Sequence, residues 1–128
     1  DINDVMDNCQ LIVTFTSSET PLLSRVNPGT HITAMGSDTL TKQELVPSIL
    51  TEADLVVADS KSQCEVRGEI HQALKSNDFS MDDVVELGDI ISGKKTGRTS
   101  DSQITIADLT GVAVQDIQIS KAVLKYLL

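Results

Sequence analysis

One acidic side chain stands where it could do chemistry. Asp38 follows Gly36 and Ser37, directly after the apolar run at 30–35, and Lys42 lies four residues further on. In an open α/β sheet the ligand crevice lies outside the carboxyl ends of the strands. A carboxylate on a short loop at that edge can exchange a proton with a bound molecule. Asp38 is therefore the first candidate for a catalytic residue, although Asp at such a position also serves as a turn or helix-capping residue.

The elements that would hold this carboxylate are predicted to be parallel strands. The run from Leu11 to Thr16 is a continuous series of apolar and β-branched residues, which is typical of a strand covered on both faces. Three further runs of this kind follow it. The predicted strands are residues 11–16, 30–35, 55–59 and 103–108.

Helical periodicity appears between these strands. The sequence predicts a short helical turn at 21–26, a polar loop at 94–102, and helices at 42–51, 60–76, 80–92 and 111–128; residues 1–8 look like the end of a polar helix. Alternating strands and helices predict a parallel sheet with right-handed crossovers. The expected fold class is therefore α/β, a three-layer sandwich with helices on each face, formed by residues 1–128 as a single domain.

Composition excludes several classes of protein. The formal net charge is −9 and aromatic residues make up 2% of the chain, which argues against a nucleic-acid-binding protein. No apolar run approaches the ~20 residues of a membrane span, so we expect a cytoplasmic protein with no membrane partner. Cys9 and Cys64 lie far apart, and His31 and His71 lack partners at ligand spacing. We therefore expect no disulfide framework and no metal site.

Seven short segments together carry a family resemblance. They are VTFTSS (13–18), PGTHI (28–32), GSD (36–38), KQEL (42–45), ADLVVAD (53–59), GEI (68–70) and GVAVQD (111–116). In this order they resemble the ornithine cyclodeaminase and mu-crystallin family, over the whole chain but only part of the family's length. The resemblance implies that the chain is the second half of an NAD(P)-binding Rossmann domain, a partial Rossmann-like domain within a longer two-domain enzyme.

The resemblance also implies roles for individual residues. Asp38 matches the general acid/base, and Lys42 matches a lysine close to the cofactor. The strand end at 14–16 matches the part beside the nicotinamide half of the cofactor, and residues 109–110 match a second loop near that ring. The implied cofactor-binding residues are Thr14, Phe15, Thr16, Lys42 and Leu109, and the implied substrate-binding residues are Asp38 and Thr110. Many relatives carry Ser at the position of Leu109, which leaves the substrate open.

The implied activity is NAD(P)-dependent hydride transfer on a small α-amino or α-imino acid, as in a cyclodeaminase, a ketimine reductase or an amino-acid dehydrogenase. Hydride removal from an amino acid needs a neutral amine, and a nearby carboxylate can take its proton. The expected cofactor of the complete protein is NAD or NADP, and its expected partner is a second copy in a homodimer. Two alternatives stay open: a non-catalytic mu-crystallin-like protein that binds a nucleotide or small ligand, and an inactive Rossmann fragment.

Overall fold

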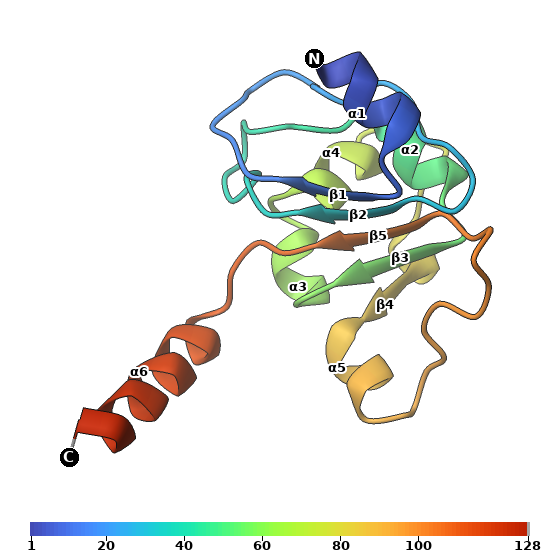
Figure 1. Ribbon diagram of the computed structural model, residues 1–128. Coiled ribbons are helices and arrows are strands. Elements are labelled where there is room, and N and C mark those ends of the chain that lie inside the picture. Colours follow the sequence, from blue (N-terminus) through green and yellow to red (C-terminus); the bar gives the residue numbers. More distant parts are fainter. Residues whose placement is uncertain (128) are drawn as a thin grey trace.

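The computed structural model describes residues 1–127, which form a five-stranded parallel sheet with helices (Figure 1). The order of the strands across the sheet is β1-β2-β5-β3-β4, so β5 lies at the centre. Because every pair is parallel, the carboxyl ends of all the strands lie at one edge. The strands are β1 (Leu11–Thr14), β2 (His31–Ala34), β3 (Leu55–Ala58), β4 (Val84–Glu86) and β5 (Thr105–Asp108).

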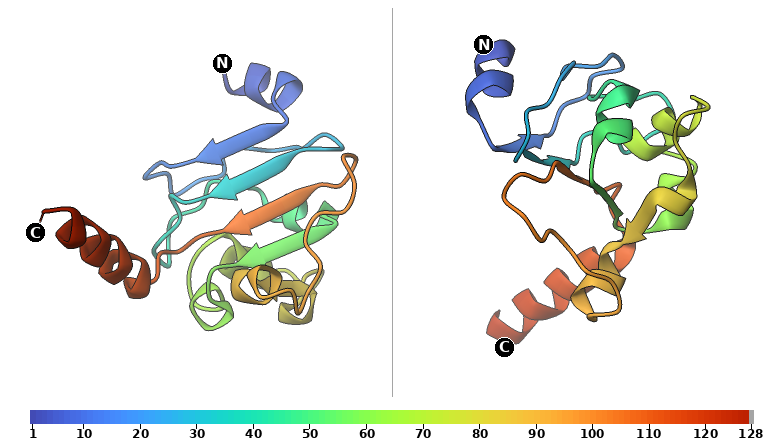
Figure 2. Two further views of the ribbon diagram at one scale, coloured as in Figure 1. Left: turned by 60° about the horizontal axis from the view of Figure 1, so that its bottom comes forward. Right: turned by 90° about the vertical axis from the view of Figure 1, so that its right-hand side faces the viewer.

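Short helices lie between β2 and β3, between β3 and β4, and between β4 and β5. Helices α2 and α4 pack together on one side of the sheet, whereas α6 extends away from it (Figures 1 and 2). None of the residues of α6 is buried. The helices are α1 (Ile2–Asn8), α2 (Pro47–Glu52), α3 (Lys61–Cys64), α4 (Glu69–Leu74), α5 (Leu87–Ile91) and α6 (Ala113–Leu127), with a 3₁₀ turn at Met81–Asp83.

A row of buried aliphatic side chains runs across all five strands and sets their register. The row is Ile12, Ile32, Ile106, Val56 and Val84, each paired with the next. A shift of one residue in any strand would move its member of the row to the opposite face, so this pattern strongly specifies the pairing. This register also aligns the carboxyl ends of the strands with one another.

The opposite face of the sheet is open at β1. Leu11 is 68% exposed and Val13 is 59% exposed. The parallel α/β fold is confirmed, but the prediction that the 11–16 run is covered on both faces is wrong. Within residues 1–127, the second helical layer of the expected sandwich does not extend over β1.

Tertiary contacts shorten the predicted 42–51 helix. It begins only at Pro47, because the backbone N–H groups of Glu44 and Leu45 donate to the carboxylate of Glu69. The same extended segment pairs with Leu23 in an isolated parallel bridge, and this bridge replaces the helical turn predicted at 21–26. The chain at 36–46 is thus a fixed loop.

Two further helix predictions need correction. The 60–76 helix is divided into α3 and α4 at Gly68, whose φ of 93° is a conformation that favours glycine. The 80–92 segment contains strand β4 as well as α5, because Val84 and Val85 pair with β3. Of the helix predicted at 111–128, the structure shows α6 from Ala113 to Leu127, and Leu128 lies outside the described residues.

Candidate functional site

A cleft of about 310 Å³ opens at the carboxyl ends of β1 and β2. Four of the residues predicted from the sequence line it, so the fold brings together side chains that are up to 27 positions apart. Phe15 and Thr16 follow β1, whereas Asp38 and Lys42 lie on the loop after β2. The complete lining is Phe15, Thr16, Ser17, Met35, Gly36, Asp38 and Lys42.

Asp38 and Lys42 form an ion pair in this cleft. The Lys42 Nζ lies 2.7 Å from the Asp38 Oδ1, and the Asp38 side chain is 52% exposed. The hydrogen bond from Lys42 is the largest cause that lowers the pKa of Asp38 below its usual value. Asp38 is therefore ionised at neutral pH and accessible from the cleft, so it can accept a proton from a bound molecule.

The walls of the cleft differ in character. The side chain of Phe15 is 78% exposed and that of Met35 is also exposed, so both offer apolar surface to a ligand. The same lining carries the opposite charges of Asp38 and Lys42. Apolar surface combined with a few polar groups is the usual composition of a small-molecule site.

Three buried carboxylates accept backbone hydrogen bonds near this edge of the sheet, and none of them was predicted as a site residue. Glu44 accepts hydrogen bonds from the backbone N–H groups of Thr16 and Gly36, at 2.6 and 3.1 Å. Asp108 accepts one from the N–H of Ile70 at 2.8 Å, and Glu69 holds the chain at 44–45. Glu44 belongs to the KQEL segment and Asp108 ends a predicted strand, so both positions were visible in the sequence but their partners were not.

The other predicted residues do not line this cleft. Thr14 lies on the buried face of β1, and its hydroxyl has no hydrogen-bond partner within residues 1–127. Leu109 directly follows β5, where its N–H donates to the carbonyl of Ala34. The hydroxyl of Thr110 is buried and donates to Asp59 at 3.2 Å. The structure therefore places Leu109 and Thr110 at the same edge of the sheet but at the end of another strand, β5.

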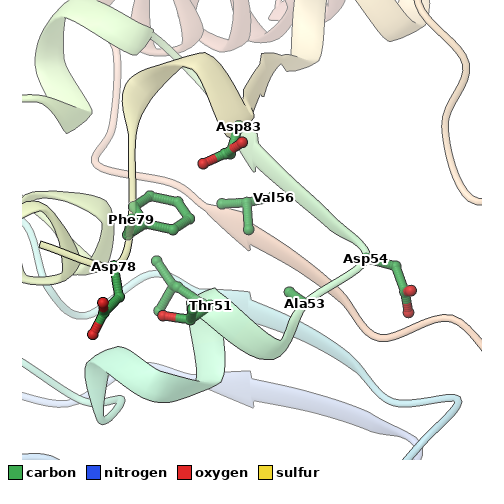
Figure 3. A pocket seen from close by; sticks show the side chains of 8 residues that line it. Thr51, Ala53, Asp54, Val56, Asp78, Phe79 and Asp83 are labelled. Atoms are coloured by element: carbon green, nitrogen blue, oxygen red, sulfur yellow. The ribbon is translucent and has the colours of Figure 1, made fainter.

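A second pocket of about 320 Å³ lies at the amino end of β3 (Figure 3). Phe79 and Asp83 stand around it, together with residues at the end of α2. It is at the opposite edge of the sheet from Asp38, and none of the predicted site residues lines it. We therefore place the candidate site at the carboxyl edge.

Two further features are absent from residues 1–127. No group of three or more His, Cys, Asp or Glu side chains is arranged to hold a metal ion. No helix in this part of the chain is long and apolar enough to cross a membrane.

Comparison with known proteins places the chain in a family. The sequence pattern of the ornithine cyclodeaminase/mu-crystallin family matches residues 1–127. The chain belongs to this family. An uncharacterised cyclodeaminase of Sinorhizobium fredii is 44% identical over 123 residues, which is 94% of this chain and 37% of that protein. The resemblance stated from the seven segments is thus confirmed.

Solved structures of ornithine cyclodeaminase/mu-crystallin family members share the fold. The iminosuccinate reductase of Paracoccus denitrificans in complex with NAD⁺ superposes with a TM-score of 0.90 and 37% identity, over 98% of this chain and 39% of that one. An archaeal alanine dehydrogenase dimer with bound NAD superposes with a TM-score of 0.83 and 41% identity, over 88% of this chain and 36% of that one. The sheet is thus of the Rossmann type. The chain spans less than two fifths of the length of these relatives.

The buried carboxylates make the stability of this ornithine cyclodeaminase/mu-crystallin family chain depend on pH. Burial raises the pKa of Asp108 to about 8 and that of Glu69 to about 7. Both values exceed those of an unfolded chain, so the folded state binds more protons, and the free energy of unfolding falls as pH rises through this range. The lowered pKa of Asp38 affects the free energy of unfolding only at pH values below this range. We expect the thermal midpoint to fall by at least ~3 °C between about pH 5 and about pH 8.

The Asp108→Asn variant tests the origin of this dependence. An amide does not titrate, so the variant should lose part of the fall in the thermal midpoint, followed by circular dichroism. Asp78→Asn, at an exposed position, is the matched control, and its thermal midpoint should fall with pH as steeply as that of the wild type. An equal slope in Asp108→Asn and the wild type would show that Asp108 is not responsible.

Proposed function

We propose that the complete protein containing this chain is an NAD(P)-dependent enzyme that transfers a hydride to or from the α-carbon of a small α-amino or α-imino acid. In it, residues 1–128 supply the second half of the Rossmann domain. The observation that carries the proposal is Asp38, an ionised and half-exposed carboxylate in a cleft at the carboxyl edge of the sheet. Two relatives with this fold are described with bound NAD.

The residues at this edge fit a nicotinamide ring. Phe15 and Met35 provide apolar surface for the face of a ring, and Thr16 and Lys42 provide polar groups beside it. Thr14 and Leu109 complete the proposed cofactor contacts. The buried hydroxyl of Thr14 has no hydrogen-bond partner within residues 1–127. NAD or NADP supplies the hydride acceptor or donor when it is bound.

Asp38 carries the proton in the proposed mechanism. In the oxidative direction its carboxylate accepts a proton from the substrate's ammonium group. Loss of this proton leaves a neutral amine, whose lone pair could form the C=N bond when the hydride passes from the α-carbon to bound NAD⁺ or NADP⁺. In the reductive direction Asp38 returns the proton to the nitrogen. Thr110 is the second proposed substrate-binding residue. In this role it can contact the substrate only if the substrate extends to the end of β5.

Lys42 sets the proton affinity of Asp38 in this proposal. Lys42→Met removes the hydrogen bond that lowers the pKa of Asp38, so this pKa should rise. Activity that requires ionised Asp38 is lost when the group is protonated. The acid limb of the profile of kcat/KM against pH should therefore move to higher pH. Lys75→Met, at an exposed position outside the cleft, should leave the limb where it is. A limb that moves to lower pH, or not at all, in Lys42→Met would contradict the assignment.

The proposed activity is tested by following NADH and NADPH absorbance with the purified complete protein. Pyruvate with ammonia, iminosuccinate and small cyclic imino acids are the substrates to supply. We expect consumption of the nucleotide with at least one of them. Tight nucleotide binding without consumption by any would favour the non-catalytic binding protein instead.

The complete protein is also proposed to be a cytoplasmic homodimer. One support is that a relative with the same fold is described as a dimer. Another is the row of exposed apolar side chains on α6, which includes Ile117 and Leu124. Sedimentation of the complete protein at several concentrations measures the state directly, and a monomer throughout would rule out the dimer.

A further inference from the structure

We infer that Glu44 is the positioning residue of this site, and that it sets the geometry of the cleft by clamping the two strand ends on either side of it. The inference rests on the proposed function, because the reaction defines what must be positioned. Glu44 itself is fully buried and does not line the cleft. It acts through the backbone of residues that do.

The carboxylate of Glu44 joins the segments after β1 and β2, beyond the backbone hydrogen bond from the N–H of Met35 to the carbonyl of Thr14. One oxygen accepts from the N–H of Thr16, just beyond β1, and the other accepts from the N–H of Gly36, just beyond β2. Thr16 and Gly36 are both lining residues of the cleft. The two oxygens of one carboxylate therefore fix the distance between the wall that carries Phe15 and the loop that carries Asp38.

Glu44 is itself held firmly. Its backbone N–H donates to Glu69 at 2.7 Å, and its carbonyl accepts from the N–H groups of Leu22 and Leu23 at 2.7 and 2.9 Å. Because Glu44 is bonded to Glu69 of α4, its carboxylate holds the two strand ends in a fixed position relative to α4. The loop between Gly36 and Glu44 is further closed by Ser37, whose buried hydroxyl donates to the carbonyl of Lys42 at 2.6 Å.

The substitution Glu44→Gln tests the clamp with little change in volume. A side-chain amide presents one acceptor and one donor, so it can accept from only one of the two N–H groups and opposes the other. The displaced loop carries Asp38, and displacements of about 1 Å can cost on the order of 100-fold in rate. We expect kcat of the complete enzyme to fall at least ~10-fold with a smaller change in KM.

Two readouts separate positioning from a loss of folding. Amide hydrogen exchange at Thr16 and Gly36 should become at least ~10-fold faster in Glu44→Gln, while exchange at Ile32 in β2 stays unchanged. In a double-variant cycle, Glu44→Gln should add little to the loss already caused by Asp38→Asn, because it acts through that residue. Glu52→Gln, an exposed carboxylate at the far end of α2, is the matched control and should change neither readout.

The milder variant Ser37→Ala covers the case in which Glu44→Gln does not fold. It removes the hydrogen bond from Ser37 to the carbonyl of Lys42 and should lower kcat about 3-fold or more. This loss should again not add to the loss caused by Asp38→Asn. Unchanged kcat in whichever folded variant is measured, or full additivity with Asp38→Asn, overturns the inference. A wild-type protein that oxidises no nucleotide would instead overturn the proposed function, and hydrogen exchange would still test the clamp.

Discussion

Replacing Asp38 with Asn should lower kcat of the complete enzyme by about 100- to 10,000-fold, the usual contribution of a general acid or base. The amide keeps the size of the side chain but cannot accept the substrate's proton at neutral pH. It also loses the ion pair with Lys42, whose Nζ lies 2.7 Å from the carboxylate. Steady-state kinetics with NADH or NADPH and the best substrate measure the effect.

Nucleotide binding should survive the same substitution. The proposed cofactor contacts come from other residues of the cleft, Phe15 and Thr16 among them, so the dissociation constant for NADH should stay within about 3-fold of the wild type. Asp78→Asn is the control, because Asp78 is exposed at the opposite edge of the sheet. Near-normal turnover by Asp38→Asn would remove Asp38 from the mechanism.

The substitution Gly36→Ala should disrupt both the fold around the site and its activity. A Cβ atom at this position would lie 2.5 Å from the backbone N and 2.5 Å from the backbone O of Thr16. Backbone atoms in a hydrogen-bonded strand end cannot move aside as a flexible side chain can. Overpacking of this kind costs about 1–3 kcal/mol or more, so we expect a clear fall in the denaturant midpoint.

The same Cβ would also enter the space around the carboxylate of Glu44. The strand ends would therefore be pushed apart, and turnover should fall by at least ~10-fold in the molecules that still fold. Gly88→Ala is the matched control: it lies in α5, and a Cβ there would meet nothing within 4 Å. If Gly36→Ala were as stable and as active as Gly88→Ala, the close approach of β1 and the loop would be wrong.

Four of the five strands were predictable because their apolar runs are visible in the local sequence. Continuous apolar runs predicted β1, β2, β3 and β5 to within two residues at either end, and a strand end followed by small residues indicated Asp38. Strand β4 was missed, since a three-residue strand has too few positions to show a period and its helical neighbours extend the helical pattern. The pairing of Val84 and Val85 with β3 decides its structure.

The sequence by itself determined the family, the parallel α/β fold and four of the residues around the cleft, because these depend on residue type and on spacing along the chain. Only the tertiary structure decided that Asp38 pairs with Lys42 in a cleft beside Phe15, and that buried carboxylates hold this edge together. The partners of Glu44 lie 28 and 8 residues away, and nothing in the local pattern distinguishes a buried glutamate from a solvated one. Such contacts form only when the register of the sheet has brought the strand ends together.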